Sequence, residues 1–177
     1  MTAGVPDGEP RIAPGTAGLR TVVGTFHRGV DPRFRAAALD GSRSAGRFSR
    51  PGAPALYLSA TPEGVAAAML AHARDGDPER EVLRFHVRAE RIVDLRDPAS
   101  LAPFGIEPED AAAPWQEAVA RGEEPPSWRV RDRLDAAGAH GLIDPSRQRP
   151  GLWHLVLFRW NVPGAPSVRA AGGRPQR

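Results

Sequence analysis

The stretch from residue 152 to 160, Leu-Trp-His-Leu-Val-Leu-Phe-Arg-Trp, is the feature that most constrains the fold of this chain. It is apolar at almost every position, so neither of its faces is suited to contact with water. A short run of this kind is typical of a central β-strand that is covered on both sides. The sequence therefore predicts a sheet with other elements packed against it.

Alternating patterns predict further strands. Residues 81–88 place Leu83, Phe85 and Val87 on one side and arginine or histidine on the other, as in a half-buried strand. Residues 21–27 and 55–59 show shorter patterns of the same kind.

A helix is predicted to begin at residues 61–63, Thr-Pro-Glu. Threonine is a suitable cap, proline is favoured in the first turn, and an acid is stabilised near the positive end of the helix. Val65, Met69 and His72 would then share one face of this helix.

Two more helices are predicted farther along the chain. Residues 107–121 form one candidate, which Pro114 breaks or restarts. Ser127 is expected to cap another over residues 128–137, which Gly138 ends. Because helices and strands follow no regular βαβ order, we expect an α+β domain rather than a doubly wound one.

The 177 residues fit a single folded domain. Residues 1–18 and 163–177 are rich in Gly, Pro and Ala, so we expect a flexible leader and a flexible tail around a domain over residues 19–162. No apolar run is long enough to span a membrane, and the N-terminus has no apolar core like that of a secretion signal. We therefore expect a cytoplasmic protein.

The charge composition is unusual but does not indicate a nucleic-acid-binding protein. All 24 basic residues are arginine, and the formal net charge is only +3. The pI of about 10.7 is high because almost nothing titrates between histidine and arginine. Without cysteine and with five scattered histidines, the chain predicts no metal site.

Two arginines are candidate anion ligands. Arg28 follows a predicted strand, and Arg47 lies in a loop where Gly46 would let the backbone approach a ligand closely. Together they are able to bind a pyrophosphate through paired, charge-assisted hydrogen bonds. The alternative is that both are solvated surface arginines.

Tyr57 and Ser146 are the other two candidates. A strand would point Tyr57, the only tyrosine, away from both Leu56 and Leu58, so its ring either stacks on an aromatic base or belongs to the core. Ser146 lies in a predicted turn, where its hydroxyl either bonds a phosphate or ribose or caps the turn.

The motifs around these residues, and their order along the chain, resemble those of the RES-domain family. Members of this family are bacterial toxins that degrade NAD. The similarity covers about residues 22–160 and rests on four pieces. These are Phe-His-Arg at 26–28, Ala-Gly-Arg-Phe-Ser at 45–49, Tyr-Leu-Ser at 57–59, and the serine turn at 142–147 with the strand at 154–158.

The resemblance implies a fold similar to that of ADP-ribosyltransferase toxins, with a mixed, split β core, flanking helices and a cleft for NAD. It also implies cleavage of the nicotinamide–ribose bond with water or phosphate as acceptor. NAD would be the substrate, with no further cofactor. A small helix-turn-helix antitoxin is the implied partner, and a homo-oligomer is left open.

The sequence departs from the family at its glutamate. The matching position, about eleven residues beyond the tyrosine, is Ala68. Glu63 is the nearest acid, but five helical residues leave it about 140° away around the axis. Asp144, beside Ser146, either reaches the cleft or is an ordinary turn residue. Two hypotheses follow: an NAD-cleaving enzyme, or a catalytically weakened NAD-binding module.

Overall fold

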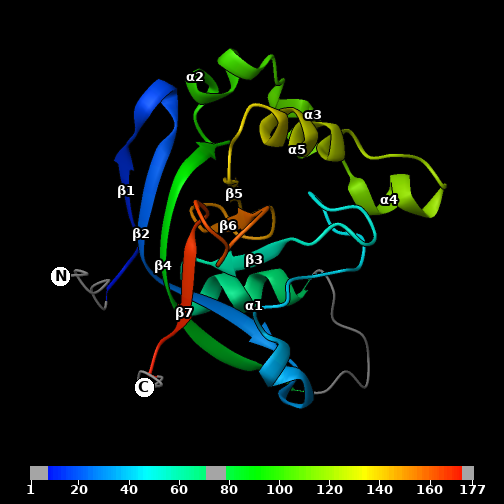
Figure 1. Cartoon of the computed structure of the whole chain (residues 1–177). Helices are drawn as coiled ribbons and strands as arrows, with labels where there is room; N and C mark the ends of the chain where they lie inside the picture. The colour runs from blue at the N-terminus through cyan, green and yellow to red at the C-terminus, as the bar shows by residue number, and fades with distance from the viewer. Residues whose placement is uncertain (1–7, 71–78, 173–177) are drawn as a thin grey trace.

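The computed structural model describes residues 8–70 and 79–172, in which a seven-stranded sheet is flanked by helices (Figure 1). The strands are β1 (Arg11–Pro14), β2 (Arg20–Val30), β3 (Leu56–Ser59), β4 (Glu81–Asp94), β5 (Gly141–Pro145), β6 (Trp153–Leu157) and β7 (Ser167–Ala170). The α-helices are α1 (Pro62–Leu70), α2 (Pro98–Leu101), α3 (Pro108–Ala112), α4 (Trp115–Ala120) and α5 (Pro126–Ala136), and the short 3-10 helices are η1 (Thr16–Gly18), η2 (Pro32–Ala37) and η3 (Ala102–Phe104).

The strand order is β1-β2-β3-β6-β5-β4-β7, and an additional pairing of β2 with β4 joins the two sides of this order. Strands β2, β3, β6, β5 and β4 therefore form a closed circuit, with β1 and β7 attached outside it. The pairing of β2 with β3 consists of one residue pair, His27 with Ser59, and is the narrowest link. Within the described residues β4–β5 is parallel and the other pairings are antiparallel.

Strand β6 is covered on both faces, as its sequence predicts. Leu155 and Leu157 belong to a core cluster with Phe26 and Phe85, inside the strand circuit. Val156 points the other way, into a second cluster beneath the helices. Figure 1 shows α2, α3 and α5 together at one end of the sheet, while α1 lies beside β3. The α+β prediction is confirmed.

The predicted start of α1 is also confirmed. The Oγ1 atom of Thr61 accepts a hydrogen bond from the backbone N–H of Gly64, as a capping side chain does. The helix is described as far as Leu70. His72, which was expected to continue one of its faces, lies outside the described residues.

Of the other two helix predictions, the interruption at Pro114 is confirmed and the cap at Ser127 is not. The segment with Pro114 forms two helices, α3 and α4, because proline supplies no N–H to continue the hydrogen bonding. The prediction that Ser127 caps α5 is wrong. This helix begins at Pro126, and the Ser127 hydroxyl donates a hydrogen bond to the carbonyl of Arg47 instead. Its end before Gly138, at a φ of 79°, is as expected.

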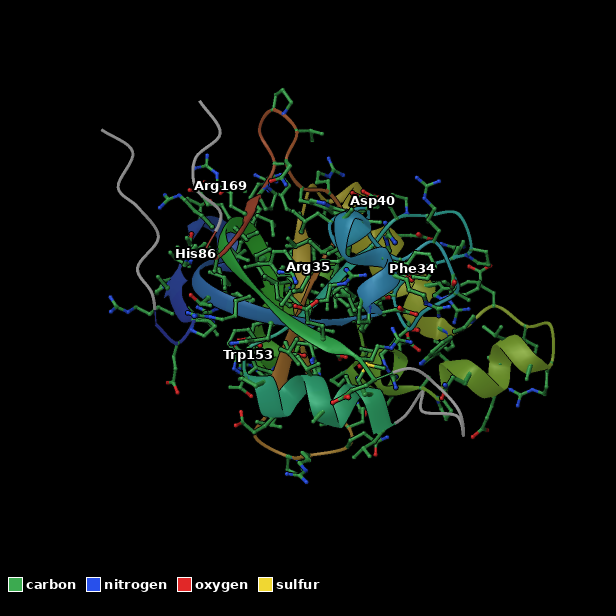
Figure 2. The ribbon with its side chains drawn as sticks, turned by 90° about the horizontal axis from the view of Figure 1, so that it is seen from below. Phe34, Arg35, Asp40, His86, Trp153 and Arg169 are labelled. Atoms are coloured by element: carbon green, nitrogen blue, oxygen red, sulfur yellow. The ribbon has the colours of Figure 1, made fainter. Side chains whose placement is uncertain are left out.

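Parts of both predicted flexible segments belong to the folded domain, which corrects the expected boundaries. Strand β1 lies within residues 1–18 and pairs with β2, and β7 lies within residues 163–177 and pairs with β4. Val168 of β7 is only 1% exposed. Figure 2 shows Arg169 of β7 near His86 of β4, its partner in the register. Here the glycines and prolines shape turns around short edge strands.

No helix in the described part of the chain is both long enough and apolar enough to cross a membrane.

Candidate functional site

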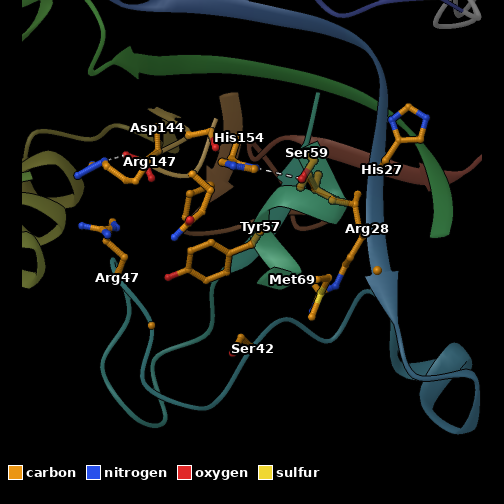
Figure 3. Close-up of a pocket in the computed structure, with 18 of the residues that line it drawn as sticks. His27, Arg28, Ser42, Arg47, Tyr57, Ser59, Met69, Asp144, Arg147 and His154 are labelled. Atoms are coloured by element: carbon orange, nitrogen blue, oxygen red, sulfur yellow. Dashed lines mark hydrogen bonds and ion pairs between the residues drawn. The ribbon is translucent and has the colours of Figure 1, made fainter. Parts of the chain in front are cut away.

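A cavity of about 570 Å³ lies where β2, β3, β5, β6 and α1 meet the loop after η2. This volume is in the range of small-molecule sites. The four predicted site residues, Arg28, Arg47, Tyr57 and Ser146, all line it. Figure 3 labels the first three. The structure thus brings together side chains that are as much as 118 residues apart in the sequence numbering.

Arg28 has a buried guanidinium nitrogen without a partner. Its Nη1 atom makes no hydrogen bond within the described residues, and burial lowers the pKa of the side chain. Figure 3 shows Arg28 extending from β2 toward Met69, on the other side of the strand from His27. A buried donor normally has a partner, since leaving it unpaired costs about 1–3 kcal/mol. Arg28 also lines the cavity, which makes its side chain a candidate ligand for an anionic group.

Arg47 is held at the opposite side of the cavity. Its Nη1 atom donates to the carbonyl of Ala113 at 3.0 Å and lies 3.5 Å from that of Ala111, at the end of α3. Burial, together with the charge of Arg147, lowers the pKa of Arg47. A site that lowers the pKa of a cation favours the approach of negative charge.

Helix α5 holds the loop that carries Arg47. The Ser127 hydroxyl bonds the carbonyl of Arg47, and the indole N–H of Trp128 donates to the carbonyl of Gly46 at 2.8 Å. Arg131 donates to the carbonyls of Phe48 and Pro54, at 3.1 and 3.0 Å. These bonds satisfy the backbone of an irregular segment and fix its path.

Tyr57 supports the same loop from the sheet. Its hydroxyl accepts a hydrogen bond from the N–H of Phe48 at 3.1 Å and lies 3.0 Å from Oγ of Ser49. Burial raises the pKa of this phenol. A Cβ atom on Gly46 would lie 2.7 Å from the tyrosine oxygen, so Gly46 allows this close contact. The hydroxyl has a structural role, while the residue also lines the cavity.

Ser146 combines the two roles considered for it. Its Oγ atom accepts a hydrogen bond from the N–H of Arg149 at 3.2 Å, which caps the turn after β5. The residue also lines the cavity. Because a hydroxyl has one hydrogen to donate as well as lone pairs, this contact leaves the O–H of Ser146 able to bond a ligand.

Asp144 is the only carboxylate among the described residues that line the cavity. It is 8% exposed, and Arg147 lies 2.9 Å from its Oδ1 atom. Burial raises the pKa of Asp144, against the opposing effects of Arg147 and Arg47. Glu63 is exposed and does not line the cavity, whereas Ala68 does. Asp144 is therefore the better-placed acid.

Ser59 and His154 are site residues that the sequence analysis did not identify. The Nδ1 atom of His154 lies 3.0 Å from Oγ of Ser59, and both residues line the cavity. Burial lowers the pKa of His154. The available signal was their polarity at the ends of two otherwise apolar strands. Among the residues that the structure describes, no group of three or more potential ligands is arranged to hold a metal ion.

The fold and the cavity together define an α+β domain with an arginine-lined cavity. The sequence model of the RES domain matches residues 25–176, and the chain therefore belongs to the RES domain family. This confirms the resemblance noted from the four motifs and extends it through β7.

Among solved structures, a similar chain comes from the crystal structure of the M. tuberculosis MbcT-MbcA toxin-antitoxin complex. The match has a TM-score of 0.51 and 16% sequence identity, and covers 83% of this chain and 81% of that chain. At this identity the likeness supports the fold. No curated protein matches the chain.

Proposed function

We propose that this protein cleaves NAD at the bond between nicotinamide and ribose, with water or phosphate as the acceptor. The main support is a cavity lined by both Arg28 and Arg47, where one buried guanidinium nitrogen of Arg28 has no partner among the residues that the structure describes. A dinucleotide supplies the anionic pyrophosphate that such donors bind, and an aromatic ring that the exposed part of Tyr57 can contact.

The proposed chemistry requires charge stabilisation more than proton donation. Nicotinamide leaves a cationic glycoside as a neutral base, so no general acid is needed. Positive charge develops on the ribose, as in other glycosidic cleavages, and a nearby carboxylate stabilises it. With alanine at position 68, we assign this role to Asp144, whose position in the lining is its support. Arg28 and Arg47 would hold the pyrophosphate and Ser146 a ribose or phosphate oxygen.

The alternative is a weakened module that binds NAD and turns it over slowly. Asp144 is paired with Arg147, and this pairing reduces the negative potential that Asp144 offers to the ribose. Loss of a preorganised electrostatic partner often costs about 10²–10³ in rate. This alternative predicts NAD binding by calorimetry without turnover, and a gain of activity on Ala68→Glu.

The test is release of nicotinamide from NAD by the purified protein, with and without inorganic phosphate. Wild-type protein is expected to release nicotinamide, and Arg28→Ala and Arg47→Ala are expected to lose most of this activity. Arg88→Ala is the matched control, because Arg88 is exposed on β4 and does not line the cavity. Wild-type release no faster than that of Arg47→Ala would reject the enzyme, and failure to bind NAD would reject the alternative too.

We further propose that this protein is a cytoplasmic toxin and that a small helix-turn-helix antitoxin neutralises it. The support is family membership and the likeness to a chain from a toxin-antitoxin complex. Expression of the protein alone should slow growth of a bacterial host, and co-expression of a small helix-turn-helix protein encoded beside it should restore growth. Normal growth despite measured NAD cleavage in the cell would contradict the toxin proposal.

A further inference from the structure

A row of polar side chains crosses three adjacent strands in the wall of the cavity. Ser59 of β3 lies opposite His154 of β6, which in turn lies opposite Asp144 of β5. Directly opposite residues point to the same face of a sheet, with Cβ atoms about 4.5–5.5 Å apart. All three residues line the cavity and are labelled in Figure 3.

His154 has one ring nitrogen engaged and the other available. Its Nδ1 atom is bonded to Oγ of Ser59 at 3.0 Å. Its Nε2 atom makes no hydrogen bond with any residue that the structure describes. Because burial lowers the pKa of His154, the ring is neutral at neutral pH, with one N–H donor and one lone pair.

The Ser59 hydroxyl is both a donor and an acceptor, so this hydrogen bond is compatible with either tautomer of neutral His154. In the tautomer in which Nδ1 donates its N–H to Oγ of Ser59, the lone pair lies on Nε2, and this is the tautomer that the proposed role requires. We propose, on the basis of the NAD cleavage proposed above, that His154 is the general base that activates water as the acceptor, with Ser59 as its positioning residue. In this proposal His154 is needed for hydrolysis, in which water is the acceptor, but not for phosphorolysis, in which inorganic phosphate is the acceptor.

The proposed step balances as follows. A water oxygen bonds to the ribose carbon that carries nicotinamide, while the carbon–nitrogen bond breaks and its electron pair stays on nicotinamide. One proton of the water passes to Nε2 of His154 and is later released to solvent. The products are ADP-ribose, nicotinamide and one proton.

Neighbouring groups are less suited to this role. Asp144 is bonded to Arg147, and the Tyr57 hydroxyl is bonded to the loop that carries Arg47. The pKa of Tyr57 is also raised by burial, so the phenol keeps its proton. Of Asp144, Tyr57 and His154, only His154 is a neutral nitrogen base in the lining, since Asp144 is paired with Arg147 and is assigned above to the charge on the ribose.

Water and phosphate make different demands on such a base. Water must lose a proton as it attacks, whereas the dianion of inorganic phosphate attacks without losing one. Removal of a general base typically costs about 10²–10⁴ in rate. Loss of His154 should therefore suppress hydrolysis and spare phosphorolysis, which a merely structural defect would not do.

The experiment measures ADP-ribose and its phosphorylated counterpart separately, with NAD as substrate and inorganic phosphate present. His154→Asn retains a hydrogen-bonding group near the Nδ1 position but has no basic nitrogen. We expect its ADP-ribose formation to fall by about 10²-fold, with phosphorolysis within about threefold of wild type. Ser59→Ala should shift the ratio the same way by a smaller factor, and His140→Asn, outside the cavity, should leave it unchanged.

The outcomes separate this inference from the function on which it rests. Nicotinamide release by wild type with an unchanged product ratio in His154→Asn overturns the role of His154 alone. Parallel loss of both products in His154→Asn also overturns it, because that result indicates a structural or binding role. Wild-type protein that forms only the phosphorylated product excludes the hydrolytic branch. No nicotinamide release by wild type overturns both proposals.

Discussion

The burial of Arg28 lowers the free energy of unfolding of the ligand-free protein, because one of its hydrogen-bond donors is unsatisfied. Its Nη1 atom is buried without a partner among the described residues, and desolvation lowers the pKa of the side chain. A buried guanidinium nitrogen without a partner, on a side chain that lines a cavity, is the pattern expected where a ligand completes the hydrogen bonding.

This reasoning predicts opposite effects on stability and activity when Arg28 is replaced. Arg28→Met should raise the free energy of unfolding by about 1 kcal/mol, because an unsatisfied buried donor is removed. The same change should lower NAD cleavage by about 10²-fold or more. Denaturant titration and the nicotinamide assay measure the two effects. Arg88→Met, at an exposed site, should change neither, and a destabilised Arg28→Met would contradict the argument.

Asp144 predicts a specific dependence of stability on pH. Burial raises its pKa above the ordinary value of about 3.9, so the folded state binds the proton more tightly than the unfolded state does. The resulting stabilisation is complete below the unfolded pKa and is lost as the pH rises through the folded pKa. Relative to Asp144→Asn, the wild type should therefore gain stability on acidification from neutral pH.

Denaturant titrations of both proteins across this pH range test the sign of that effect. A wild-type-minus-variant difference that stays flat would contradict the assignment. A difference that grows toward neutral pH would show that the pairing with Arg147 outweighs burial.

At the scale of elements, α5 matters to the site although it contributes no residue to the cavity lining. It binds the backbone around Arg47 through Ser127, Trp128 and Arg131. The position of the arginine in the cavity therefore depends on a helix more than seventy residues later in the chain.

Trp128→Phe tests this dependence. The change removes the N–H that bonds the Gly46 carbonyl, which should cost about 1–3 kcal/mol and weaken NAD binding measured by calorimetry. Trp160→Phe is a matched control, because the Trp160 indole bonds the Leu39 carbonyl at the same distance of 2.8 Å and Trp160 does not line the cavity. Equal losses of NAD binding in the two variants would contradict a specific role for α5.

The local patterns of the sequence predicted the larger elements well. Alternation predicted β4, the continuous apolar run predicted β6, and Thr61 with Pro62 predicted the start of α1. The hydrogen bond of Ser127 and the pairing of Ser59 with His154 were not predictable in this way, because each joins segments about eighty or more residues apart. The motif around Arg47 located the loop correctly but did not indicate that Gly46 is required by Tyr57.

At the scale of the whole molecule, the sheet extends farther than composition indicated. Strand β7 covers one side of β4, where Val168 lies opposite Val87 in the register. Asn161 fixes the entry to β7 by exchanging two hydrogen bonds with the backbone of Val168, at 2.8 and 2.9 Å. The segment expected to be a free tail thus protects an interior strand.

A chain that ends at residue 162 should therefore be less stable than the full chain. It lacks β7 and exposes part of the apolar surface of Phe85 and Val87, which should cost about 2–4 kcal/mol. Thermal and denaturant unfolding measure the loss. Arg169→Ala in the full chain, at an exposed position of the same strand, should leave stability nearly unchanged. Equal stability of the shortened and full chains would show that β7 contributes nothing.

The circuit of five strands also determines how the cavity can adapt to ligands. In its strand-built wall, β5 and β6 are each hydrogen-bonded to a neighbouring strand on both sides, whereas β3 is held mainly by its four residue pairs with β6 and is joined to β2 by a single pair. The opposite wall consists of irregular backbone anchored by single side chains such as Trp128 and Tyr57. Molecules of different bulk must therefore be accommodated by displacement of the loop, and crystal structures of different complexes should superimpose closely in β3, β5 and β6 while diverging at residues 42–54.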